Sequence, residues 1–279
     1  SLRMPPEGKG QALKPQQVRL LVEWIRQGAV SPDGEAPQTD PKAHWAFRAP
    51  GRQPVPVAAE SHNRIDDYIA AGLQKRGVNR LPQAPRETLL RRVYLDLVGV
   101  PPTTREQAAF AADTAPGAYE RVVDRLLESP WYGERWGRHW MDIWRYSDWY
   151  GRRKVPDSLN SYGQIWRWRD WIIRSINNDK SYDRMIVEML AADEVAADDD
   201  ENLVATGFII RNFYRWNYNT WLKDNIEHTG KAFLGLTFNC CHCHDHKYDP
   251  LTQVDYFRMR ATFEPIEVRH DRVAGEADP

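Results

Sequence analysis

From about residue 62 onward, apolar side chains recur every third or fourth position, and glycine or proline follows most of these runs. That spacing matches one face of an α-helix, which turns once in about 3.6 residues. Glycine and proline are typical of helix ends, because glycine accepts left-handed backbone and proline cannot continue the hydrogen-bond ladder. Few stretches alternate apolar and polar residues as strands do. The pattern therefore predicts a mainly α fold, an irregular multi-helix domain with long loops and little β.

Several helix boundaries can be predicted in more detail. Thr103 and Glu106 have the spacing of a capping box, so we expect a helix to begin just after Pro102. The acidic stretch 191–202 (AADEVAADDDEN) is weakly apolar, and its charges predict a solvated loop. Further helices are predicted over 15–27, 163–177, 181–191 and 220–237.

Composition excludes several classes of protein. The 279 residues can bury a real core, and 42% hydrophobic with 28% charged residues is ordinary for a globular chain. The 38 Lys and Arg residues almost balance the 39 Asp and Glu residues, so no polybasic surface for nucleic acid is predicted. No apolar run approaches the roughly 20 residues that a membrane-spanning helix needs. We expect neither a nucleic-acid partner nor a membrane span in this chain.

All three cysteines and three of the eight histidines fall within residues 238–247, FNCCHCHDHK. Cysteines this crowded cannot form a disulfide framework, which favours a local chemical site. Cys240, Cys243 and His244 fit C-x-x-C-H, the attachment motif of c-type haem. Its spacing lets two thiols reach the two vinyl groups of one porphyrin edge, while the following imidazole binds the iron. We therefore predict one covalent haem c, with His244 as the proximal ligand.

Two other interpretations of the cysteine stretch stay open. The three thiols and neighbouring histidines could hold zinc or copper, although structural zinc sites usually pair two separated knuckles and no second one is present. The cluster could also be reactive thiols without a cofactor. Cys241 lies between the haem cysteines and is expected to point away from the porphyrin.

The sixth iron position decides what a haem at this site would do. A second histidine or a methionine gives an electron carrier, whereas an open position permits oxidoreductase or peroxidase-like chemistry. His139, on a helix striped with tryptophan, is the first distal candidate, and His228 is the second. His139 can equally be a structural histidine. His62 and Met141 are weaker candidates.

Charged residues near these positions are candidates for contact with the haem propionates. Arg138, Arg145 and Lys247 could pair with carboxylates, because guanidinium and ammonium groups bind them well. Asp245 and His246 could support the proximal ligand. For each of them a structural or surface ion pair is the plainer interpretation.

The motif also carries a resemblance to a known family. Ala232–Thr237 (AFLGLT), followed by C-x-x-C-H-D-H-K and Asp249-Pro250, resembles the cytochrome-associated domain of planctomycete and related bacterial proteins. This chain departs from relatives in having Cys241 and His242 between the haem cysteines. Other matching stretches are 44–47 (HWAF), 90–99 (LRRVYLDLVG), 101–103 (PPT), 136–142 (WGRHWMD), 145–146 (RY) and 205–208 (ATGF).

The resemblance implies an organisation and a location. Residues 1–29, with Met4 as a distal ligand of a neighbouring haem, resemble the end of a cytochrome c domain. A proline-rich linker over 30–60, a helical haem-binding domain over 61–265 and a tail over 266–279 would follow. The resemblance implies an exported, periplasmic or extracellular protein whose redox partners include an adjacent cytochrome c domain. A haem oxidoreductase acting on sugar-derived substrates and a zinc-held interaction domain are the alternatives.

Overall fold

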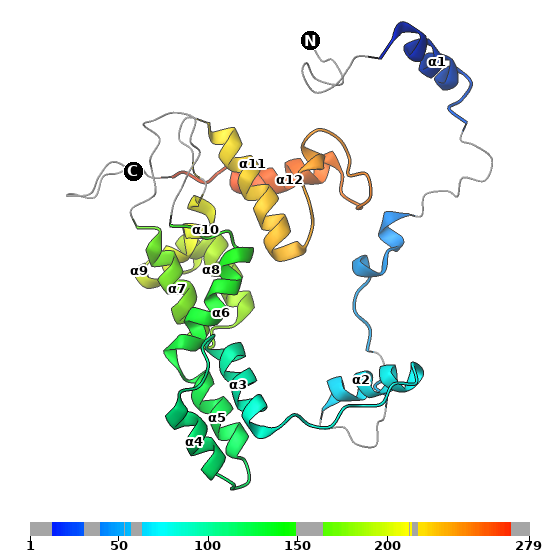
Figure 1. Cartoon of the computed structure of the whole chain (residues 1–279). Helices are drawn as coiled ribbons and strands as arrows, with labels where there is room; N and C mark the ends of the chain where they lie inside the picture. Colours follow the sequence, from blue (N-terminus) through cyan, green and yellow to red (C-terminus); the bar gives the residue numbers. More distant parts are fainter. Residues whose placement is uncertain are drawn as a thin grey trace. The chain divides into compact units, whose positions relative to one another are not determined.

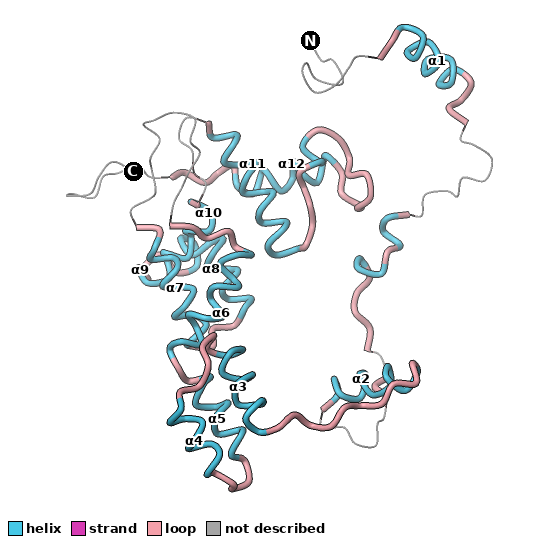
Figure 2. The backbone as a smooth tube through the Cα atoms, in the orientation of Figure 1, coloured by secondary structure: helices cyan, strands magenta, loops and turns pink. Residues whose placement is uncertain are grey.

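The structure is a computed structural model that describes residues 13–30, 40–52, 54–56, 63–148, 164–211, 213 and 217–268. All regular elements in these ranges are α, 3-10 or π helices, and Figure 2 shows no strand among the described residues. The predicted mainly α fold is therefore confirmed. Within the same ranges, no helix has both the length and the apolar character needed to cross a bilayer.

The chain divides into two compact units, Ser1–Pro50 and Gly51–Pro279. In the first, helix α1 (Pro15–Arg26) confirms the helix predicted over 15–27, and Gly28 follows it with a φ of 91°. Two short 3-10 turns, Pro41–Ala43 and Trp45–Phe47, complete the described elements of this unit. No side chain of this unit is buried among its described residues.

The second unit begins with α2 (Arg64–Lys75), α3 (Arg86–Leu97), α4 (Thr104–Ala112) and α5 (Ala118–Leu127). Helices α3, α4 and α5 pack together (Figure 1). The predicted capping box begins α4, since the Glu106 carboxylate accepts from the Thr103 backbone N–H at 2.7 Å. The small core of these three helices contains Leu90, Val93, Tyr94, Val98, Phe110, Ala118, Val122 and Leu126.

A larger core lies among the helices that follow, and it is built around aromatic rings. Helix α6 packs closely along α7, because Gly133 and Gly137 have no side chain to separate the two helices. A Cβ at Gly137 would lie 3.3 Å from Ile173. These helices are α6 (Pro130–Ile143), α7 (Trp166–Asn177), α8 (Tyr182–Val195), α9 (Asp200–Leu203), α10 (Gly207–Ile210), α11 (Tyr218–Thr229) and α12 (Gln253–Phe263). The largest fully buried rings are Trp144, Trp168, Trp171, Trp221, Tyr256 and Phe208.

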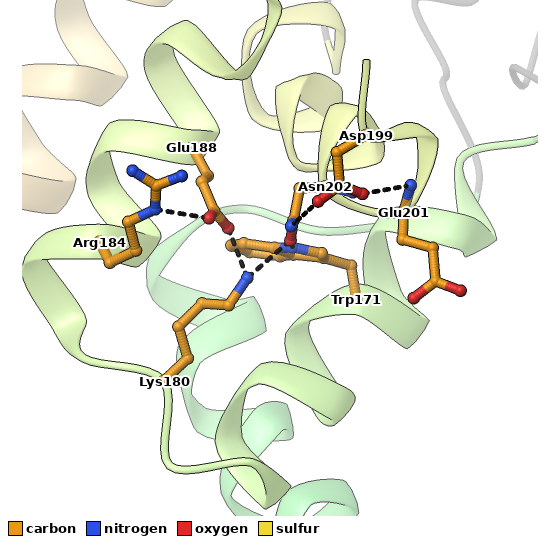
Figure 3. A network of polar contacts seen from close by, with 7 residues as sticks. All are labelled: Trp171, Lys180, Arg184, Glu188, Asp199, Glu201 and Asn202. Carbon is orange, nitrogen blue, oxygen red and sulfur yellow. Dashed lines mark hydrogen bonds and ion pairs between the residues drawn. The ribbon is translucent and has the colours of Figure 1, made fainter. Parts of the chain in front are cut away.

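The prediction of a solvated loop over 191–202 is wrong at both ends of the stretch, because both ends are helical. Helix α8 continues to Val195, and α9 begins at Asp200. Asn202 belongs to a polar network that Figure 3 shows, in which its side-chain oxygen accepts from the indole of Trp171 at 3.1 Å and from Lys180 at 2.6 Å. These contacts tie the acidic stretch to the core, which the charges of the stretch did not predict.

The helix predicted over 220–237 also ends differently. Helix α11 stops at Thr229, and a π-helical turn, Gly230–Leu234, carries the chain to Gly235 with a φ of 64°. The expected helix does not run into the first cysteine. A non-helical segment follows Gly235 and leads to a separate 3-10 turn at Cys240–His242.

Candidate functional site

The cysteine turn, which we define as residues 238–246, presents two thiols and the imidazoles of His242 and His244 on its surface. The backbone N–H groups of Cys243 and His244 both donate to the carbonyl oxygen of Cys240, at 3.2 and 3.4 Å. In a turn of this kind, residues three positions apart lie on one face. Cys240, Cys243 and His244 are all exposed. The two cysteines of the motif are therefore accessible together.

Cys241 has the opposite environment. Its side chain is fully buried in the aromatic core, and Sγ lies 3.7 Å from the carbonyl oxygen of Leu251. Burial raises the pKa of the Cys241 thiol. A buried, protonated thiol is a poor nucleophile. Cys241 therefore lies on a different face of the turn from the two exposed thiols, and its orientation relative to a porphyrin stays a prediction.

The ring of His244 is oriented by its own neighbour. Nδ1 lies 2.7 Å from the carbonyl oxygen of Asp245. A carbonyl can only accept, so Nδ1 carries the hydrogen and donates it, and Nε2 of the neutral ring keeps its lone pair. Histidines that ligate metals commonly have this arrangement, with one nitrogen bonded to a backbone carbonyl and the other at the metal.

Side chains from two helices hold the cysteine turn in place. The amide of Asn239 donates to Glu227 of α11 at 2.6 Å. On the other side, the carboxylate of Asp245 accepts from the backbone N–H of Gln253 at 2.8 Å, and the Gln253 amide donates to the carbonyl of His242 at 3.3 Å. The turn is thus fixed between α11 and the start of α12.

His246 holds the loop that follows the motif. Its Nδ1 accepts from the backbone N–H groups of Tyr248 and Asp249, at 3.3 and 2.8 Å. With Nδ1 as the acceptor, Nε2 carries the hydrogen and donates to the hydroxyl of Thr237 at 3.2 Å. Both ring nitrogens are therefore used. Like Asp245, His246 supports the shape of the site in this structure.

Two aromatic residues seat the turn against the core. Phe238 packs over Gly230, where an added Cβ would lie 2.5 Å from the ring, so only glycine allows this approach. Tyr256 of α12 is fully buried, and its ring meets that of His242 at 5.4 Å in an edge-to-face contact. Burial also raises the pKa of the Tyr256 hydroxyl. The motif is therefore packed against Gly230 through Phe238 and against α12 through Tyr256.

The two distal candidates lie in different surroundings. His139 is exposed on α6, and its ring contacts Trp136 edge to face at 5.6 Å. His228 on α11 is half-buried, and burial, with Arg145 and two further cations, lowers its pKa to about 3. Among the described residues, neither histidine shares a hydrogen bond or ring contact with the cysteine turn. Their role as distal ligands remains a prediction.

The two predicted propionate partners, Arg138 and Arg145, also differ from each other. Arg138 is exposed and pairs with Asp142 one turn further along α6. Arg145 has a φ of 58°, donates to the carbonyl of Phe208 at 3.0 Å and lies over the Phe208 ring. Arg145 is thus held by Phe208, and its charge is one cause of the lowered pKa of His228, whereas Arg138 stays on the surface.

The weaker candidates and Lys247 complete the set. Met141 is buried in the larger core, where it packs as an ordinary apolar residue. Lys247 is exposed, and its ammonium group lies 5.1 Å from the centre of the Tyr248 ring. Met4 and His62 lie outside the described residues.

The donor set of the turn can be compared with the needs of a covalently attached haem and of a closed metal site. In the part of the chain that the structure describes, no three His, Cys, Asp or Glu side chains are placed to share a metal ion. Two exposed thiols at i and i+3, followed by an imidazole with a free nitrogen, are instead the groups that C-x-x-C-H chemistry requires.

Sequence reasoning missed Glu227 and Tyr256. Glu227 stands four residues from Lys223 and from Lys231, a spacing typical of surface ion pairs, yet it is largely buried and bonds Asn239. Its contact depends on the chain folding back after Gly235, and no local pattern predicts that. Thr252 and Asp255 do form a capping box, a pattern that predicts where α12 begins.

Residues 64–268 of the chain match the model of a described family. A family model described as PSCyt2, protein of unknown function (DUF1549), matches residues 64–268. The match extends from the start of α2 to beyond the end of α12 and includes the whole cysteine turn. Neither a curated protein nor a solved structure matches the chain.

Proposed function

The chain belongs to the PSCyt2 family of proteins of unknown function, and from this premise we propose that it is a c-type cytochrome module that transfers electrons. The observation that carries the proposal is the arrangement of the cysteine turn. Cys240, Cys243 and His244 are exposed together, while the third thiol, Cys241, is buried beneath them. The resemblance to cytochrome-associated domains of planctomycete proteins supports the same conclusion.

Each residue of the turn has a part in this proposal. Cys240 and Cys243 would hold the porphyrin through thioether bonds, and Nε2 of His244 would bind its iron. The Asp245 carbonyl orients the His244 ring, and Glu227 fixes the turn through Asn239. Burial removes Cys241 from competition with the two attachment thiols. Bound haem would supply a one-electron redox couple.

The proposal also implies a cellular location and a class of partner protein. Covalent haem is attached to exported chains outside the cytoplasmic membrane, so a periplasmic or extracellular location follows. The partners would be redox proteins, including an adjacent cytochrome c domain. Residues 1–29 resemble the end of such a domain.

The test compares two single-cysteine variants of the full chain, exported in a host that attaches haem c. The parent and Cys241→Ala should keep haem after denaturation, whereas Cys243→Ala should lose the thioether at that position and with it most covalent haem. Haem staining of a denaturing gel and visible spectra of the oxidised and reduced protein measure this. Undiminished haem in Cys243→Ala, or a colourless parent that contains zinc, would contradict the proposal.

A further inference from the structure

A cleft lies beside α3, far along the chain from the cysteine turn. It has a volume of about 630 Å³, which is in the range of about 300–1,000 Å³ found for small-molecule sites. Thr88, Arg91 and Arg92 of α3 line one side. Pro101 and Pro102, in the segment that leads to α4, line the other. The cleft therefore combines two cationic side chains with a wall of proline rings.

The two sides of the cleft are held in place independently of any ligand. The opposite face of α3 is buried in the small core through Leu90, Val93 and Tyr94. On the other side, the side-chain amide of Gln107 donates to the carbonyl of Pro102 at 3.0 Å. The capping box described above begins α4 directly after this segment. A cleft with fixed sides loses little conformational entropy on binding.

The start of α3 is also tied to the end of α4. Arg86 donates to the carbonyls of Phe110 and Asp113, at 3.0 and 2.7 Å, and its guanidinium lies 4.3 Å from the centre of the Phe110 ring. Arg86 is thus occupied by the fold, in contrast to the two arginines of the cleft.

Among the described residues, Arg91 and Arg92 form no ion pair and no side-chain hydrogen bond. Glu87 stands four residues before Arg91, and Asp96 stands four residues after Arg92. Ion pairs on helices commonly form at this spacing. Other carboxylates at this spacing are paired in the structure, such as Asp142 with Arg138 and Glu264 with Arg260. The guanidinium donors of Arg91 and Arg92 are therefore available to a ligand in the cleft.

We propose that this cleft binds a small molecule that carries one carboxylate or phosphate group on an apolar body. Two neighbouring guanidinium groups match the oxygen geometry of either anion, and the Thr88 hydroxyl offers a further hydrogen bond. Proline rings lack an N–H donor, so the facing wall suits the apolar part of the ligand. Glu87 in the lining leaves a net charge near +1, which fits a single anionic group.

Calorimetric titration of the full chain with phenyl phosphate, benzoate and inorganic phosphate tests this site. We expect saturable binding of phenyl phosphate or benzoate, and weaker binding of inorganic phosphate, which has no apolar body. Arg91→Gln and Arg92→Gln should each lower the association constant about tenfold or more, because each removes a charge-assisted hydrogen bond. Arg91→Lys keeps the charge but loses the planar fork and should give an intermediate loss.

Arg105→Gln is the matched control, because Arg105 is exposed on α4 and does not line the cleft. It removes the same charge and should leave binding unchanged. No saturable binding of any of the three probes would overturn the proposal. An equal loss in Arg105→Gln would also overturn it, since the effect would then come from overall charge. None of these residues belongs to the cysteine turn, so the outcome is separate from the haem proposal.

Discussion

At the scale of single residues, neighbours in the sequence receive opposite environments. Cys240 is exposed and Cys241 is fully buried, although only one peptide bond separates them. A 3-10 turn rotates each residue by about 120° relative to the one before it, so adjacent side chains leave on different faces. The turn therefore leaves the two cysteines of C-x-x-C-H exposed and places Cys241, between them, in the core.

His228 gives a prediction about pH at this scale. Its burial is the largest cause of a pKa near 3, with Arg145 next, so the folded chain holds the imidazole neutral. An unfolded chain takes up this proton near pH 6.5. The contribution of His228 to stability is therefore complete above about pH 6.5 and falls as the pH decreases toward 3.

We expect His228→Gln to lose less stability than the parent chain between pH 7 and pH 5. Urea unfolding midpoints at the two pH values measure the difference, and comparison within each protein cancels any general effect of the substitution. His139→Gln is the control, because that imidazole stands in solvent on α6. A parent and a His228→Gln variant that weaken equally would refute the prediction.

At the scale of elements, one polar network joins α7, α8 and α9, the last of which begins in the acidic stretch (Figure 3). Glu188 of α8 is only 2% exposed, and its carboxylate accepts from Lys180 at 2.5 Å and from Arg184 at 2.7 Å. Lys180 extends the network to Asn202, which also accepts from the buried indole of Trp171. A buried carboxylate with two cationic partners is satisfied, and loss of Asn202 would leave the buried Trp171 indole N–H without its acceptor.

Asn202→Ala should lower the free energy of unfolding by about 1–3 kcal/mol, because it leaves the Trp171 indole N–H buried without its acceptor. Chemical denaturation followed by tryptophan fluorescence measures this change. Asp198→Ala, an exposed residue of the same acidic stretch, should change stability by less than about 0.5 kcal/mol. Equal effects of the two substitutions would contradict the prediction, because the contact between Asn202 and Trp171 would then add no measurable stability.

At the scale of the whole molecule, stability is unevenly divided between the two units. Among the described residues, the buried side chains all lie in Gly51–Pro279, in the small core of α3 to α5 and the larger core of α6 to α12. The described part of Ser1–Pro50 buries no side chain, and α1 has none in a core. Burial of apolar surface is the main favourable term in folding, so the second unit carries the stability.

Removal of Ser1–Pro50 should therefore leave the free energy of unfolding of the remaining chain within about 0.5 kcal/mol of that of the parent. Circular dichroism during urea unfolding of both chains measures this. The helical signal per molecule should fall by the contribution of α1, which the shortened chain lacks. A large loss of stability in the shortened chain would mean that the first unit contributes to the fold of the second.

Local patterns determined much of the fold. The apolar spacing predicted the helical class, α1, α7 and most of α8, and the Thr103–Glu106 pair predicted the start of α4. Each of these rests on contacts within a few residues of the chain. The C-x-x-C-H motif likewise predicts a haem-attachment site at Cys240, Cys243 and His244 from spacing alone.

Only the tertiary structure decided which side chains face the core. It placed Cys241 and Glu227 inside, gave His246 a role in holding its loop, and joined Asn202 to Trp171. These contacts depend on segments that meet after the chain reverses, such as Glu227 with Asn239 beyond Gly235. Sequence determines local geometry through short-range sterics and hydrogen bonds, whereas the burial of a given charge or thiol depends on long-range packing that no local pattern contains.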